Sequence, residues 1–181
     1  MEEAVLHSGS SQRAALLTRA HLAAMLVAVT AFVVDQATKP LAHAYVEQNG
    51  PLQITSFLTM TAGWNTGVAF GVAALAHPSV LIAVGLGLSA VLAVFLAKTD
   101  STFEKIALGM AIGGALANVL DRARFGAVRD FIDFHVNDWH WPAFNFADVF
   151  IVVGLFSLLF AGREQRRPAT ERRPHNGGEP R

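Results

Sequence analysis

The stretch ALANVLDRARFGAVRDFIDFHVNDWHWPAFNFADVFIVVGLF, residues 115–156, places charged side chains beside long apolar runs. Its acidic and basic residues are Asp121, Asp130, Asp133, Asp138, Asp148, Arg122, Arg124 and Arg129. The whole chain of 181 residues is 52% hydrophobic and only 15% charged, and its mean hydropathy is +0.39. This composition predicts an integral membrane protein. Because ionisable groups are costly at membrane depth, those in the stretch are candidates for a function.

Four apolar runs approach the length of about 20 residues that a membrane-spanning helix needs. They cover residues 21–34, 78–97, 106–120 and 143–162, and the third extends back to residue 102. The first run reaches spanning length only if Asp35 and its neighbours lie at the interface. A cleaved signal peptide is the alternative for this run, but no A-x-A site ends it and the polar residues of DQATK follow. We therefore expect an all-α membrane protein with four transmembrane helices.

The basic residues indicate how these helices are oriented. The side with both termini holds Arg13, Arg19, Lys98, Lys105 and the arginines between residues 163 and 181, and the other side holds Lys39, Arg122, Arg124 and Arg129. The positive-inside rule places the richer side in the cytoplasm, so loops 35–77 and 121–146 face outward. We expect a cytoplasmic segment at 1–20, a membrane domain at 21–162 and a disordered basic cytoplasmic tail at 163–181. The chain has no cysteine, which excludes disulfides and a thiol nucleophile.

The outer segments show signs of a small β-sheet. In residues 51–61, PLQITSFLTMT, apolar and polar side chains alternate as in a half-buried strand. We expect an extracytoplasmic sheet platform, followed by a periplasmic loop, that holds an extended peptide by strand addition. Trp64, Trp139 and Trp141 fit an interfacial aromatic belt. A metal site at His135, Asp138 and His140 is disfavoured, because the spacing in DFHVNDWHW matches no zinc pattern.

Several polar residues have a structural interpretation. Asn145 and Asp148 have the spacing of a helix N-cap and its N3 residue, and Asn118 and Asp121 repeat it. Asp121, however, follows an apolar run, so it lies at a helix end where Arg122 and Arg124 offer ion pairs. Asp35 and Lys39 have the i, i+4 spacing of a helical ion pair.

Asp130 and Asp148 are harder to explain structurally. Asp130 lies among apolar residues of an outer loop, and Asp148 lies at the start of the last helix. Two carboxyl groups in a poorly hydrated cleft do not both ionise readily, so they share a proton. One then acts as a general base on water and the other as an acid, as in aspartyl proteases. On spacing, Asp133 and Asp138 remain alternative partners.

Four separated blocks resemble bacterial lipoprotein signal peptidase, also called signal peptidase II. They are DQATK at Asp35, NTGVAFG at Asn65, GGALANVLDR at Gly113 with VRDFIDF behind it, and FNFADVFI at Phe144. The resemblance extends from about residue 20 to residue 162 and makes the membrane domain a peptidase domain. It implies an aspartyl endopeptidase of the bacterial inner membrane that cuts prolipoproteins before a diacylglyceryl-modified cysteine. It also implies inhibition by globomycin and contact with membrane lipid, with no nucleic acid, cofactor or metal; we expect a monomer.

The resemblance also implies roles for particular residues. Asp130 and Asp148 are the catalytic pair it implies, and the residues that support the pair or bind substrate are Asn65, Asn118, Arg122, Asn145, Asp35 and Lys39. Two positions depart from the family pattern: Ala117 stands where glycine is usual, and Arg129 where valine is usual. Neither departure removes a catalytic group.

Two alternatives fit the sequence less well, one from another protease family and one from another function class. Membrane aspartyl proteases of the presenilin or prepilin-peptidase kind carry a GxGD motif, which this sequence lacks. A small membrane transporter would use carboxylates as a proton or cation path. Its acidic groups would lie within the spans, whereas here nearly all of them fall in outer loops and helix ends.

Overall fold

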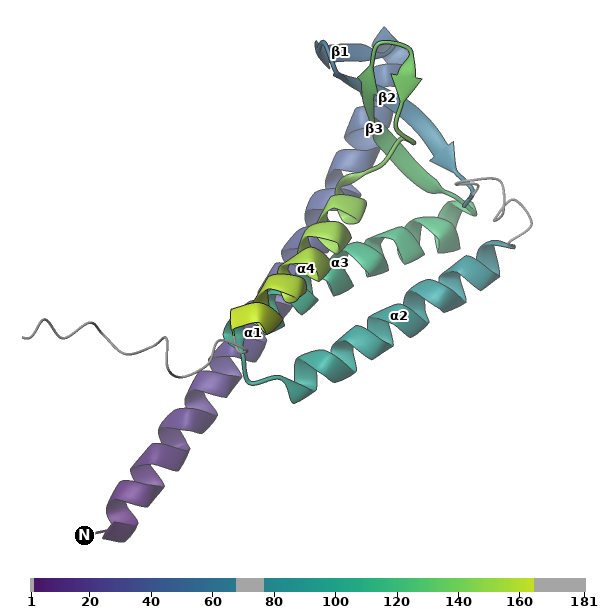
Figure 1. Ribbon diagram of the computed structural model, residues 1–181. Coiled ribbons are helices and arrows are strands. Elements are labelled where there is room, and N and C mark those ends of the chain that lie inside the picture. The colour runs from purple at the N-terminus through teal and green to yellow at the C-terminus, as the bar shows by residue number, and fades with distance from the viewer. Residues whose placement is uncertain (1, 68–76, 165–181) are drawn as a thin grey trace, which may run out of the picture.

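The computed structural model describes residues 2–67 and 77–164, with side chains at 16–67 and 77–161. Its helices are α1 (Glu2–Asn49), α2 (Pro78–Lys98), α3 (Thr102–Phe125) and α4 (Phe146–Glu164), and its strands are β1 (Leu52–Thr55), β2 (Leu58–Asn65), β3 (Val128–Val136) and β4 (Trp139–His140). The strands form a small sheet at the end of the helices that lies away from the N-terminus (Figure 1). The predicted fold class, a helical membrane protein with a small sheet, is confirmed.

The helices have the length and surface of membrane-spanning segments. Residues Leu16–Asn49, Pro78–Lys98 and Thr102–Phe125 are long and apolar enough to cross a bilayer, and the apolar part of α4, Phe146–Ala161, is shorter. Large apolar side chains such as Val84, Phe95 and Leu159 are exposed. A soluble protein rarely exposes so much apolar surface, whereas a bilayer covers it. The protein is therefore an integral membrane protein.

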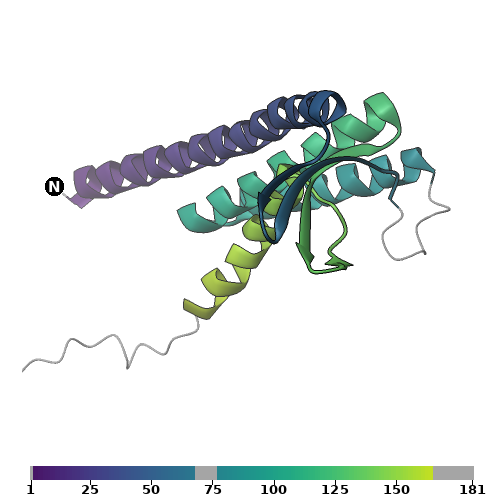
Figure 2. The ribbon, with the colours of Figure 1, turned by 90° about the horizontal axis from the view of Figure 1, so that it is seen from above.

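Helix α3 is the centre of the bundle, and it packs against α1, α2 and α4 (Figure 2). Small residues allow these close approaches. A Cβ atom at Gly113 would clash with the backbone of Ala28 on α1, and one at Gly114 would clash with the backbone of Ala147 on α4. Membrane helices commonly pack through such small residues, because the backbones then come near enough for extensive van der Waals contact.

The first helix is longer than the sequence suggested. We expected it to end near Asp35, with an outward loop at 35–77, but α1 continues through Pro40 to Asn49. That expectation was wrong because it assumed that Asp35 and Lys39 are solvated at a helix end. Both side chains are fully buried against other elements and form an ion pair with one another. The polar cluster therefore lies inside the helix and not at its end.

The sheet is antiparallel, with the strand order β1-β2-β3-β4. The segment expected to form one strand at 51–61 is instead a hairpin, in which Leu52 pairs with Met60. The expected outward loop at 121–146 is also largely ordered. Helix α3 ends at Phe125 and is capped by Gly126, which has the left-handed φ of 73° that glycine adopts readily. Strands β3 and β4 follow. Part of the NTGVAFG block, residues 68–71, lies outside the described residues.

Candidate active site

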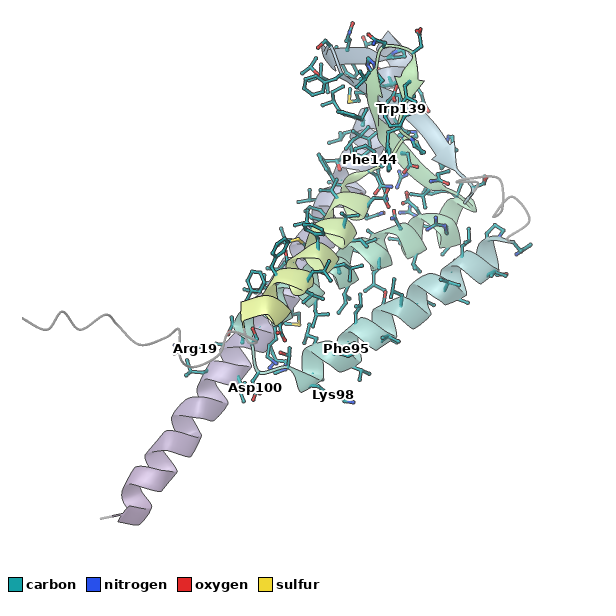
Figure 3. All side chains as sticks on the ribbon, viewed as in Figure 1. Arg19, Phe95, Lys98, Asp100, Trp139 and Phe144 are labelled. Carbon is teal, nitrogen blue, oxygen red and sulfur yellow. The ribbon has the colours of Figure 1, made fainter. Side chains whose placement is uncertain are left out.

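Asp130 lies in the buried first half of β3 and is only 2% exposed. The residues after it turn toward the segment that precedes α4, where the backbone N–H groups of Phe131 and Ile132 donate to the carbonyl oxygen of Phe144 at 3.1 and 2.9 Å. Phe144 lies at this junction of β3 and α4 (Figure 3). The strand therefore brings Asp130 to the beginning of the last helix.

Asp148 lies in the first turn of α4, and Asn145 caps this helix. The Asn145 Oδ1 accepts a hydrogen bond from the Asp148 backbone N–H at 3.1 Å, and Asp148 Oδ2 accepts one from the Asn145 backbone N–H at 3.2 Å. These reciprocal bonds are the capping box that the spacing predicted. They hold the Asp148 carboxylate at the helix N-terminus.

Asn145 also joins the two carboxyl groups. Its Nδ2 donates to Asp130 Oδ1 at 2.6 Å, while its backbone N–H donates to Asp148, as above. Asn118, on α3, donates from Nδ2 to Asp148 Oδ1 at 2.8 Å, and the Asn65 side chain is hydrogen-bonded to Asp130. The structure thus brings Asp130 and Asp148 to one site, together with the three predicted asparagines.

The two carboxyl groups differ in how deeply they are buried. The pKa of Asp130 is raised from 3.8 to about 6, mainly by burial and also by the nearby negative charge of Asp148, while hydrogen bonds from Asn65 and Asn145 oppose the rise. Asp148 is only half-buried. Because desolvation disfavours the charged form of a carboxyl group, a proton shared by the pair resides mainly on Asp130.

A buried charge network lies behind this pair. The Lys39 Nζ is 2.6 Å from Asp35 Oδ2 and 3.4 Å from Asp121 Oδ2, and it donates to Asn118 Oδ1 at 2.9 Å. The hydrogen bond from Lys39 fixes the orientation of the Asn118 amide, so that the amide N–H faces Asp148. Asp35 in turn accepts a hydrogen bond from the Ala147 backbone N–H at 2.8 Å, which ties α1 to α4.

Asp121 has different partners from those expected. We predicted ion pairs with Arg122 and Arg124, but Asp121 binds Arg129 through both carboxylate oxygens, at 2.9 Å from Nη2 and 3.3 Å from Nε. Asp121 and Arg129 face one another because β3 folds back onto the end of α3. Arg129, the departure from the family pattern, therefore serves in this chain as a buried partner for Asp121.

Arg122 lies near the carboxyl groups. It interacts electrostatically with Asp148, Asp130 and Asp121, in decreasing order. Its Nε is buried and has no hydrogen-bond partner among the described residues.

The alternative acidic partners are directed elsewhere. Asp133 Oδ2 lies 2.9 Å from His140 Nδ1, and Asp138 is exposed in the turn before β4. Within residues 2–67 and 77–164 no group of three acidic or histidine side chains is placed to hold a metal ion. Trp139 and Trp141 are also exposed.

A pocket of about 220 Å³ opens beside Asp130. It is lined by Gly63, Trp64, Asn65, Thr66, Asp130, Pro142 and Ala143. Sequence reasoning missed two residues near this site, the half-buried Gln36 and the buried His43. Gln36 donates to Asp121 Oδ1 at 3.0 Å, and it directly follows Asp35 in the DQATK block, which was the available signal. His43 lies outside every block.

Comparisons with known proteins agree on one family. Residues 27–162 match the family described as Signal peptidase (SPase) II. The chain is 38% identical over 143 residues to a lipoprotein signal peptidase of Anaplasma marginale, covering 78% of this chain and 84% of the relative. For a lipoprotein signal peptidase of Nitrobacter hamburgensis the identity is 36% over 145 residues, with 75% and 88% covered. A bacterial membrane enzyme solved by the in meso method is similar in structure, with a TM-score of 0.65, 27% identity and 76% and 90% of the chains covered.

Proposed function

This chain belongs to the signal peptidase II family, whose members are aspartic-type proteases that cleave signal peptides from prolipoproteins. We propose that it uses Asp130 and Asp148 to cut the peptide bond before a diacylglyceryl-modified cysteine. The observation that carries this proposal is the position of Asn145, which donates a hydrogen bond to each carboxyl group. Contact with the same residue places both carboxyl groups at one site, which supports their joint action on one water molecule.

The proposed reaction starts with Asp148 as the base and Asp130 as the acid. Asp148 removes a proton from water, and the water oxygen bonds to the carbonyl carbon of the scissile peptide. Asp130 donates its proton to the carbonyl oxygen, which gives a neutral tetrahedral diol. The carbon–nitrogen bond then breaks: Asp148 gives its proton to the cysteine nitrogen, and Asp130 takes back a proton from one hydroxyl of the diol as the carbonyl re-forms, which restores both groups. The assignment rests on the deeper burial and the raised pKa of Asp130.

The polar neighbours have supporting roles in this proposal. Asn65 and Asn145 orient Asp130, and Asn118 orients Asp148. Arg122 binds a substrate carbonyl oxygen beside the carboxyl pair, with which it interacts electrostatically. Asp35 and Lys39 act indirectly, because Lys39 holds the Asn118 amide in its orientation.

A lipid-modified cysteine fits the surroundings of the site. An apolar pocket of about 460 Å³ lies next to the catalytic strand. Its lining includes Leu41 and Tyr45 from α1, Ile54 from β1, Phe131 from β3 and Phe146 from α4. Leu41, Tyr45 and Ile54 are exposed, so the pocket opens onto surface that lipid covers. Acyl chains anchored in the bilayer would present the scissile bond at headgroup depth.

The orientation of the chain follows from the same proposal. Arg19, Lys98 and Asp100 lie at the end of the bundle away from the sheet, and Trp139 lies on the sheet (Figure 3). We place the sheet and the carboxyl pair on the outer face of the bacterial inner membrane, with residues 1–20 and the tail 163–181 in the cytoplasm. The working unit is a monomer of the peptidase domain, residues 21–162, and globomycin is expected to block it.

Cleavage of matched precursors tests the substrate proposal. Purified protein should cut a diacylglyceryl-modified prolipoprotein at least about 100-fold faster than the same precursor without the lipid, because the acyl chains hold the peptide at the site. The measurement is the initial rate of signal-peptide release, followed on a gel in the same detergent. Equal rates for both precursors would contradict the requirement for lipid while leaving the protease activity intact.

The pH dependence tests the division of roles. Asp130 must carry the proton that reaches the carbonyl oxygen, and its pKa of about 6 lies above the usual value of 3.8. Raising the pH through this pKa removes the proton, so kcat/KM should fall about tenfold per pH unit above about pH 6. A kcat/KM that stays constant from about pH 5 to about pH 8 would exclude this role. The Asp133→Asn variant, altered outside the pair, should show the same profile as the wild type.

A further inference from the structure

His43 is buried beside the catalytic strand, although no motif in the sequence includes it. It lies on α1 one turn after Lys39 and is 5% exposed. Its ring meets Trp64 edge-on, with the ring centroids 5.5 Å apart. Its Nε2 lies 3.1 Å from the backbone carbonyl oxygen of Asp130. One side chain therefore contacts both the backbone of Asp130 and a wall of the pocket beside it.

The hydrogen bond defines the state of the ring. A carbonyl oxygen only accepts, so Nε2 of His43 carries the hydrogen and donates it. The Nδ1 is buried and has no hydrogen-bond partner among the described residues. The contact of the ring with the Asp130 backbone therefore depends on Nε2 alone.

The backbone around Asp130 depends on such bonds. The register of β2 and β3 shifts between Met60 and Gly63, and Gly63 is the residue opposite Asp130. A shift of this kind interrupts the regular ladder and bends the strand. Bonds from outside the ladder hold the strand here: the N–H of Arg129 donates to Asp121 Oδ2 at 3.1 Å, and the N–H of Phe131 donates to the Phe144 oxygen, as noted above. His43 binds the carbonyl between these two N–H groups.

We propose that His43 is a positioning residue for peptide hydrolysis, whose Nε2–H fixes the Asp130 peptide and so directs the Asp130 carboxyl group at Asn145 and Asp148. This inference rests on the proposed function, and in it His43 acts through Asp130 and not on the reacting atoms. Rotation of the peptide after Asp130 would swing the strand and move the carboxyl group. A displacement of about 1 Å in a catalytic group is enough to lower a rate about 100-fold.

A pair of substitutions separates the hydrogen bond from the ring packing. His43→Phe keeps a ring against Trp64 but removes the donor, and His43→Gln keeps an N–H at nearly the same reach but removes the ring. His43→Phe should lower kcat about 10- to 100-fold with KM unchanged within about twofold, and His43→Gln should retain kcat within about threefold. The readouts are kcat and KM for a lipid-modified prolipoprotein, with inserted protein and Tm measured on the same samples.

The outcomes distinguish this inference from the function on which it rests. Wild type and the exposed-site control His140→Gln should cleave, and Asp130→Asn should not; failure of that set overturns the proposed function. If the set holds, a His43→Phe variant with the wild-type kcat overturns the positioning role. Equal losses in the Phe and Gln variants overturn it as well, because they would report ring packing. Should His43→Phe fail to insert, His43→Asn replaces it, since its shorter amide does not reach the carbonyl.

Discussion

Asp130→Asn and Asp148→Asn should each leave a lipid-modified prolipoprotein uncleaved, with the rate lowered at least about 1,000-fold. An amide neither removes a proton from water nor donates one as a carboxylic acid does, so either change breaks the proton transfer. The side chain keeps its size, and Asn145 still has an oxygen at each position to which it can donate. The measurement is the ratio of precursor to mature lipoprotein over time on a gel.

Matched controls come from the same strand and turn. Asp133→Asn and Asp138→Asn change acids that lie outside the pair, one bound to His140 and the other exposed. Both variants should retain most of the activity. Normal processing by Asp130→Asn or by Asp148→Asn, with the protein correctly inserted, would mean that the catalytic pair is wrongly assigned.

Lys39→Met should lower the free energy of unfolding by about 3–5 kcal/mol, because it leaves a buried negative charge without its cation. The buried network holds two acids, Asp35 and Asp121, against two cations, Lys39 and Arg129. Removing Lys39 leaves one acid unbalanced. The Tm in detergent should fall on the order of 10 °C, whereas Lys98→Met, which changes an exposed lysine, should leave it nearly unchanged.

A double substitution separates charge imbalance from lost packing. Asp35→Asn combined with Lys39→Met removes one charge of each sign and leaves Asp121 with Arg129. The amide introduced by Asp35→Asn still has an oxygen that can accept from the Ala147 backbone N–H. The double variant should regain most of the lost Tm. If it unfolds at or below the temperature of Lys39→Met, uncompensated charge is not the cause of the instability.

Patterns within one helical turn were read correctly from the sequence. The i, i+4 spacing of Asp35 and Lys39 predicted their ion pair, and the spacing of Asn145 and Asp148 predicted the capping box. In both cases the partners lie a few residues apart, so helix geometry fixes their distance. The pairing of Asp130 with Asp148 in catalysis remains a prediction, supported by their shared contact with Asn145.

Contacts between distant segments were the ones that the sequence did not reveal. Asp121 was assigned to Arg122 and Arg124, its neighbours in sequence, yet it binds Arg129 because β3 reverses onto α3. The length of α1 was underestimated for a related reason. A run of polar residues is interpreted as a helix end when its interaction partners are unknown. The partners of Lys39 include Asn118 and Asp121, which lie about 80 residues later in the sequence. His43 bonds a backbone oxygen, and such a bond leaves no residue pattern to recognise.

The most direct test of a shared catalytic water is a double-variant comparison of single-turnover cleavage rates. Residues that act as one unit lose their effect together, so their losses do not multiply. Asp130→Asn, Asp148→Asn and the variant with both changes should all cleave at the same residual rate, within about threefold. If the fold-loss in rate of the double variant equals the product of the two single fold-losses, the two carboxyl groups work independently.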